Sequence, residues 1–78
     1  MAIYYFKILN DEVTEDFEGA ELADDQAART YAITAARSLA ADTVSKGHFT
    51  RSHRIVIQDG QREPVGEVRF DEAVEVRP

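Results

Sequence analysis

Carboxylates are the densest group of side chains in this sequence that could do chemistry. The segment between Asn10 and Ala28 holds eight acids and no base: Asp11, Glu12, Glu15, Asp16, Glu18, Glu21, Asp24 and Asp25. A calcium loop of the EF-hand type needs a glycine at its sixth position, and the sixth residue counted from Asp11 is Asp16. Nothing in the segment predicts a dry pocket that would shift carboxylate pKa values toward acid–base catalysis. We therefore interpret it as a solvated acidic segment that sets solubility and partner choice.

The other candidate catalytic or metal-binding groups are sparse. His48 and His53 are the only histidines, and two ligands without a third predict no metal site. Ser38, Ser45 and Ser52 lie in no strained elbow of the kind that activates a nucleophile, and the four glycines form no phosphate-binding loop. We predict that the chain is not an enzyme and binds neither a cofactor nor a metal.

A small basic patch follows the acidic segment. The stretch from Thr43 to Gln58 has no acids, and its candidate contact residues are Lys46, His48, Phe49, Arg51 and Arg54. This patch could dock an acidic partner, a weakly held phosphate, or the acidic segment of a second copy. The alternative is balanced surface charge on a loop that follows a helix.

One long helix has to position these groups. Asp25 to Lys46 contains seven alanines, the best helix formers. Asp24 is the expected N-cap, and Gly47 suits the left-handed conformation that ends many helices. A spacing of 100° per residue predicts that the buried face consists of Ala28, Tyr31, Ala32, Ala35, Ala36 and Leu39, with Thr43 at its margin.

A second stripe of the helix is the strongest indication of association. Ile33, Arg37, Ala40 and Val44 flank the predicted buried face. The outer face is poor in charge for a helix that meets only water, with Thr30, Thr34, Ser38 and Ala41. The functional interpretation is a surface covered by a partner. The alternative is that the flanking stripe lies at the edge of the sheet and belongs to the core.

Strand-like segments surround the helix. They are residues 2–9, 13–17, 53–58 and 65–70, and Leu22 is expected to pack under the helix. Asp59-Gly60 predicts a hairpin turn that Gln61 and Arg62 could lengthen. Asp71 could cap one short turn, residues 71–74, before Val76 ends the fold. The sequence therefore predicts an α+β two-layer sandwich, β-β-α-β-β, with one long helix on a small, mainly antiparallel sheet. A β-grasp-like order, with the first and last strands parallel and adjacent, remains open.

Length and charge limit the function. The 78 residues form one domain, 1–78, whose small core makes stabilisation by a homodimer worth considering. The sequence has no cysteine, no export signal and no apolar run long enough for a membrane span, so we expect a cytoplasmic protein. A net charge of −6 is the wrong sign for holding a phosphate backbone, so nucleic-acid binding is not expected to be general.

Several short motifs resemble those of one family. They are I-Y-Y-F at 3–6, D-F-E-G-A-E-L at 16–22, A-A-R at 35–37 followed by Leu39-Ala40, and V-R-F-D-E-A-V at 68–74. The family comprises short bacterial proteins, common in alphaproteobacteria, and is known only as a domain of unknown function. Many members have a proline where this chain has Ala23, a difference that loosens the entry to the helix. The resemblance implies a self-contained cytoplasmic domain and supplies no catalytic or ligand residues.

Three functions follow in order of preference. The first is a non-catalytic protein-interaction or regulatory module that associates with itself. The second is an accessory nucleic-acid-linked protein that uses Lys46, Phe49, Arg51 and Arg54. The third is a small enzyme or ligand carrier that uses His48 or His53 with a carboxylate.

Overall fold

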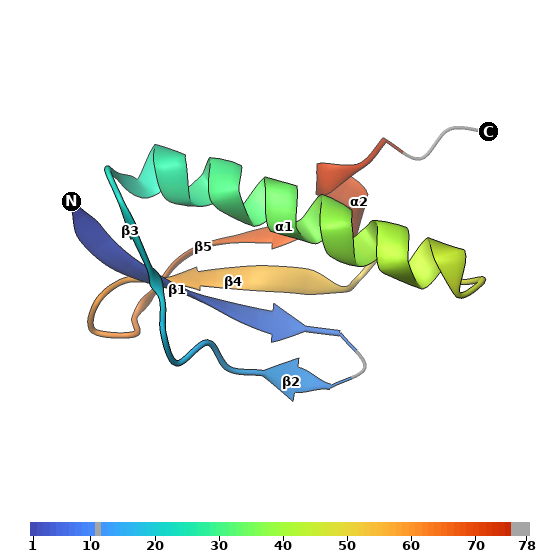
Figure 1. Ribbon diagram of the computed structural model, residues 1–78, viewed down its shortest axis with the longest axis horizontal. Coiled ribbons are helices and arrows are strands. Elements are labelled where there is room, and N and C mark those ends of the chain that lie inside the picture. The colour runs from blue at the N-terminus through green and yellow to red at the C-terminus, as the bar shows by residue number, and fades with distance from the viewer. Residues whose placement is uncertain (11, 76–78) are drawn as a thin grey trace.

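The computed structural model describes residues 1–10 and 12–75 (Figure 1). The elements are β1 (Ala2–Leu9), β2 (Val13–Thr14), β3 (Ala20–Leu22), α1 (Asp25–Ser45), β4 (Arg54–Gln58), β5 (Pro64–Arg69) and α2 (Phe70–Ala73). The expected α+β sandwich with one long helix is confirmed, because α1 lies across a single small sheet. The molecule is elongated, with extents of 39 × 23 × 16 Å.

All strand pairs of the sheet are antiparallel. The order is β2-β1-β4-β5, and β3 pairs with the other end of β1 on the same side as β2. The central ladder joins β1 to β4, with Phe6 opposite Ile57 and Ile8 opposite Ile55. The first strand is therefore interior, whereas the last strand lies at an edge. The β-grasp-like order is not the one that forms.

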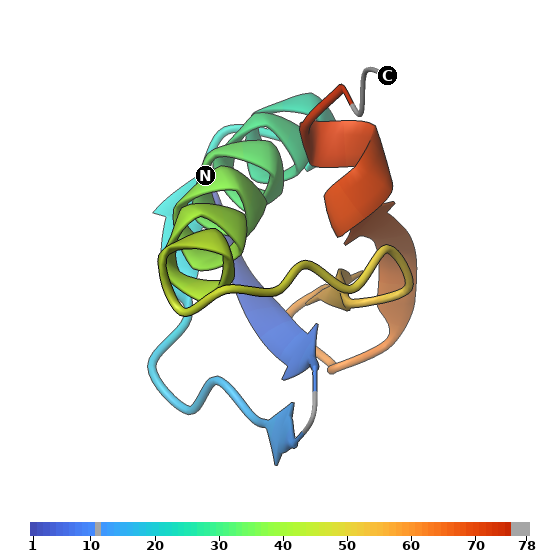
Figure 2. The ribbon, with the colours of Figure 1, turned by 90° about the vertical axis from the view of Figure 1, so that its right-hand side faces the viewer.

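The core lies between one face of the sheet and the two helices (Figure 2). Alternating side chains of the strands point toward α1, as the period of two requires. The buried side chains of the sheet are Tyr4, Phe6, Ile55, Ile57 and Val68. Phe70 and Ala73 of α2 complete the core.

The helix has the expected ends. Asp24 accepts a hydrogen bond from the backbone N–H of Ala27 at 2.8 Å, and Gly47 has a left-handed φ of 98°. Its buried line differs from the prediction and consists of Ala28, Ala32, Ala36 and Ala40. Tyr31 is 48% exposed, so the prediction that it belongs to the buried face is wrong. The buried face of α1 is turned away from Tyr31 relative to the prediction, because α2 covers the flank of α1 on the other side (Figure 2).

Several shorter predictions also need correction. The second strand ends at Thr14 and not at residue 17, and β3 was not predicted. The final turn begins at Phe70, and Glu72, not Asp71, accepts the hydrogen bond from the backbone N–H of Arg69. The hairpin loop is lengthened as expected, since the N–H of Asp59 donates to the carbonyl of Glu63. The predictions for Asp11 and Val76 lie outside the described residues.

Candidate interaction site

The acidic segment contains a structural carboxylate, Asp16. One of its oxygens accepts hydrogen bonds from the N–H groups of Glu18 (3.2 Å) and Gly19 (3.0 Å), and the other accepts from the N–H of Phe6 (3.2 Å). Phe6 lies in β1 between the stretch that pairs with β3 and the stretch that pairs with β2. Asp16 thus takes the place of a strand partner at this edge. Its carboxylate therefore accepts hydrogen bonds from backbone N–H groups of β1 and of its own loop. The sequence analysis did not predict this role.

Gly19 is required by the same loop. Its φ is +73°, and a Cβ there would lie 2.9 Å from the carbonyl oxygen of Tyr4. The loop therefore packs tightly against β1, and residues 16–19 keep a fixed conformation for both steric and hydrogen-bonding reasons.

Arg62, in the β4–β5 hairpin loop, contacts both this loop and β1. The Cζ atom of Arg62 lies 3.8 Å from the centroid of the Tyr5 ring, and its guanidinium donates to the carbonyl of Asp16 at 2.9 Å. Phe17 extends beyond this arginine and is 83% exposed. Three segments far apart in the chain meet here, so a local sequence pattern could not have revealed the cluster.

Tyr4 and Asp25 connect the sheet to the first turn of α1. The phenol donates to a carboxylate oxygen of Asp25 at 2.6 Å. This hydrogen bond, together with burial and the nearby negative charge, raises the pKa of Tyr4 to about 12. Because Asp24 caps the helix and Asp25 binds Tyr4, both carboxylates have structural roles.

The predicted basic patch is largely occupied by other contacts. Lys46 forms an ion pair with Asp42 at 3.0 Å, and Arg54 forms one with Glu67 at 3.4 Å. Phe49 is half-buried against the core. His48 and Arg51 are exposed and lie beyond the end of α1.

The two histidines have different environments. His53 is 6% exposed and packs edge-on against Phe70, with ring centroids 5.7 Å apart. His48 is exposed. Across residues 1–10 and 12–75, no group of three or more His, Cys, Asp or Glu side chains could hold a metal ion.

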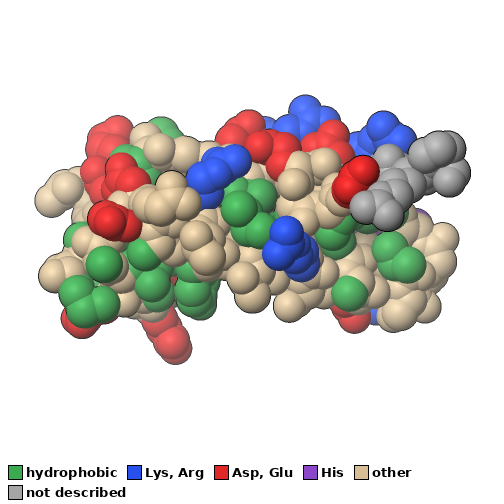
Figure 3. Space-filling view, turned by 90° about the horizontal axis from the view of Figure 1, so that it is seen from above, with side chains coloured by type: hydrophobic (Ala, Val, Ile, Leu, Met, Phe, Trp, Pro, Cys, Tyr) green, Lys and Arg blue, Asp and Glu red, His purple; other side chains and the backbone are tan. Residues whose placement is uncertain are grey.

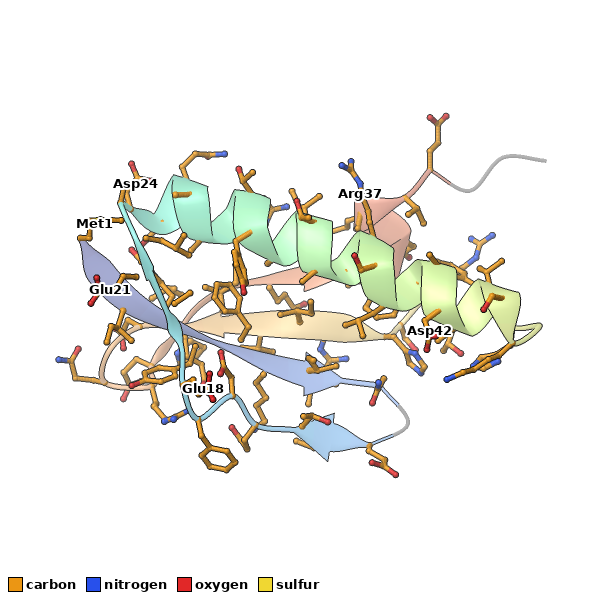
Figure 4. All side chains as sticks on the ribbon, in the orientation of Figure 1. Met1, Glu18, Glu21, Asp24, Arg37 and Asp42 are labelled. Atoms are coloured by element: carbon orange, nitrogen blue, oxygen red, sulfur yellow. The ribbon has the colours of Figure 1, made fainter. Side chains whose placement is uncertain are left out.

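The flanking stripe of α1 faces the C-terminal helix. Ala40 is 2% exposed and belongs to the core, and Ile33 packs against that core. Arg37 donates to the carbonyl of Ala73 at 2.7 Å, so it joins α1 to the end of α2 (Figure 4). Val44 is 58% exposed. Of the four residues in this stripe, Val44 and part of Arg37 are therefore the ones that remain available on the surface for contact with a partner.

Side chains also cap the free edge of β5. Arg29 of α1 donates to the carbonyl of Glu67 at 3.3 Å and pairs with Glu72 at 3.2 Å. Glu72 in turn accepts from the N–H of Arg69. An uncapped edge strand is a template for pairing with another chain. Arg29 and Glu72 therefore disfavour extension of the sheet at β5.

An apolar groove runs along the outer side of α1. It has a volume of about 460 Å³ and is lined by Leu22, Ala27, Thr30, Tyr31, Thr34 and Ala35. A second hollow of about 300 Å³ shares Tyr31 and Ala35 and continues toward β2. The Tyr31 ring packs against the Phe6 ring at a tilt of 35° with centroids 4.6 Å apart, so it is supported from the core. The groove combines an ordered, half-exposed aromatic ring with uncharged walls formed by α1 and Leu22.

Acidic side chains gather at the end of the groove where α1 begins (Figure 3). Figure 4 places Glu21 and Asp24 at the end of the molecule where α1 begins, and Figure 3 shows acidic side chains gathered there. Lys46 follows the other end of the helix, and His48 and Arg51 come next in the chain. In the part of the chain that the structure describes, no helix is long and apolar enough to cross a membrane.

Comparison with known proteins identifies one family. Residues 3–71 match the model of a domain of unknown function, DUF6894. Searches of curated proteins and of solved structures gave no significant match.

Proposed function

This chain belongs to the DUF6894 family, a domain of unknown function, and we propose that it is a non-catalytic protein-interaction module that associates with a second copy of itself. The observation that carries the proposal is the uncharged groove beside α1, in which Tyr31 is held half-exposed on a chain of net charge −6. Concave apolar surfaces with an aromatic anchor are typical of binding sites.

The non-catalytic part of the proposal is supported by what the acids do. Asp16, Asp24 and Asp25 each accept hydrogen bonds that hold the fold together. The histidines lie in unlike environments, one buried and one exposed. The proposal includes a bacterial cytoplasmic location, which is supported by a sequence without cysteine and by the family resemblance.

The alternative function is an accessory role with nucleic acid through the basic patch. It has weaker support, because Lys46 and Arg54 are paired with acids and Phe49 packs against the core. Binding to mixed DNA and RNA that weakens steeply with added salt would favour this alternative.

Absolute mass by light scattering on a sizing column tests the proposal. We expect a dimer at high protein concentration in both low and high salt, because an apolar groove is not screened by ions. A dimer that dissociates in salt would assign the association to the charged ends of the molecule. A monomer at every concentration and salt would overturn self-association.

A further inference from the structure

We propose that the second copy lies antiparallel along the groove beside α1, about a two-fold axis that passes between Thr34 and Ser38. This inference rests on the self-association proposed above and adds the surface and the orientation. An interface of this kind is isologous, so both copies use the same residues and the assembly closes as a dimer.

The spacing along the outer side of α1 fits a helix–helix seam. Ala27, Tyr31, Thr34, Ser38, Ala41 and Ser45 alternate at intervals of four and three residues. This is the spacing of a two-helix contact, and every member except Ala27, which is half-buried, is exposed in the single chain. Five of the six side chains are small, so a second helix can approach closely, and Tyr31 fills the space beside β3.

Two hydroxyl groups of this seam, those of Thr34 and Ser45, and the hydroxyl of the adjacent Thr30 are already bonded to the helix. Thr30 donates to the carbonyl of Gln26 at 3.1 Å, Thr34 to that of Thr30 at 3.2 Å, and Ser45 to that of Asp42 at 3.1 Å. A buried hydroxyl destabilises an interface chiefly when its donor loses its partner. Because these donors keep theirs, the surface can be covered without leaving them unsatisfied.

Charge selects the antiparallel orientation. Glu21, Asp24 and Asp25 lie at the start of α1. Near its other end Asp42 pairs with Lys46, and the exposed Arg51 follows in the next loop. An antiparallel pair places the acidic end of each copy beside the end of the other copy that carries Lys46 and Arg51, and it also opposes the two helix dipoles favourably. A parallel pair would place acids beside acids.

The β5 edge of the sheet offers a less favourable route. Arg29 donates to the carbonyl of Glu67 there, and Glu72 accepts from the N–H of Arg69. A second copy that added a strand would have to displace these side chains, whereas the groove is open.

The length of α1 sets the expected strength. Its 21 residues span about 31 Å, so the interface lies at the small end of stable protein contacts. We therefore expect dissociation at roughly micromolar concentrations, and the experiments need a concentration series.

Cysteine cross-linking tests the geometry, because the chain has no cysteine of its own. A two-fold axis between Thr34 and Ser38 places Ala27 opposite Ser45 of the other copy. Mixing the single variants Ala27→Cys and Ser45→Cys under mild oxidation should give a cross-linked dimer about tenfold faster than either variant alone. The variant Gln61→Cys, in the exposed hairpin loop, gives the rate of random collision.

A second pair of variants tests the groove without a covalent bond. Thr34→Glu places two like charges near the axis and should weaken dimerisation at least about tenfold. Gln61→Glu adds the same charge elsewhere and should leave it unchanged. Circular dichroism of each variant at low concentration checks that the fold persists.

The outcomes separate the two proposals. Rapid self-cross-linking of Ala27→Cys would overturn the antiparallel orientation. A dimer that tolerates Thr34→Glu and cross-links no faster than Gln61→Cys would overturn the groove while leaving self-association intact. A wild-type chain that is monomeric at every concentration would overturn both.

Discussion

The phenol of Tyr4, in β1, donates a 2.6 Å hydrogen bond to Asp25, in the first turn of α1. This contact spans the two layers of the fold at the end where the chain passes from β3 into the helix. Its consequences, and those of other contacts described above, lead to four predictions.

Tyr4→Phe should lower the free energy of unfolding at neutral pH. The variant should also lose less stability than the wild type as the pH is raised into the alkaline range. The pKa of Tyr4 is raised from 10.0 to about 12, so the folded state favours the protonated phenol. The resulting stabilisation is fully present below about pH 10 and is lost as the pH rises through about 12. Urea unfolding at about pH 8 and about pH 11.5 should show a difference between wild type and Tyr4→Phe that shrinks at the higher pH. Tyr31→Phe is the control, and an equal response in both variants would refute the role of Tyr4.

Asp16→Ala should destabilise the protein by about 1–3 kcal/mol, because the N–H of Phe6 loses its acceptor in a partly buried position. Asp16→Asn keeps one acceptor oxygen and should have an intermediate effect. Glu18→Ala, an exposed change in the same loop, should alter stability by less than about 0.5 kcal/mol. Denaturant midpoints measure all three. Equal midpoints for Asp16→Ala and Glu18→Ala would show that Asp16 does not organise the loop.

Gly19→Ala should be more harmful than Gly47→Ala. Both glycines have positive φ angles, of 73° and 98°, so a side chain at either position strains the backbone by about 1 kcal/mol or more. Only at Gly19 would the added Cβ also collide with the backbone of Tyr4, whereas no heavy atom lies within 4 Å at Gly47. Thermal unfolding of the two variants side by side measures the difference, and a reversed order would contradict it.

Arg29→Ala should promote aggregation with little change in stability. Its ion pair with Glu72 is exposed, so we expect a loss of less than about 1 kcal/mol. The carbonyl of Glu67, however, loses its side-chain donor, and the edge of β5 becomes available to other chains. Light scattering of concentrated, warmed samples should rise faster for Arg29→Ala than for Arg51→Ala, which removes the same charge from an exposed loop. Equal rates would show that Arg29 does not protect the edge.

The sequence predicted those features that depend on neighbouring residues. The cap at Asp24, the left-handed Gly47 and the alternation of β4 all follow from local preferences. The exposed position of Tyr31 did not follow, because the buried arc of α1 depends on where the distant α2 packs.

The candidate site was less predictable than the fold. The outer face of α1 was correctly identified as poor in charge, but Ala40 belongs to the core and Arg37 binds α2. The groove needs Leu22 from β3, a strand too short to be predicted from its composition. The loop contacts of Asp16 and Arg62 join residues 46 positions apart, which no periodic pattern can show.

The central ladder also has a consequence for synthesis of the chain. β1 leaves the ribosome first, but it lies in the middle of the finished sheet and pairs mainly with β4, which ends at Gln58. Until Gln58 has emerged, β1, which has apolar side chains on both faces, cannot complete its pairing with β4. Contacts between distant segments form slowly, whereas the β4–β5 hairpin and α1 depend on nearby residues. We therefore expect α1, the β4–β5 hairpin and the short β1–β2 pair to form first. The long-range pairing of β1 with β4 would form last and limit the folding rate.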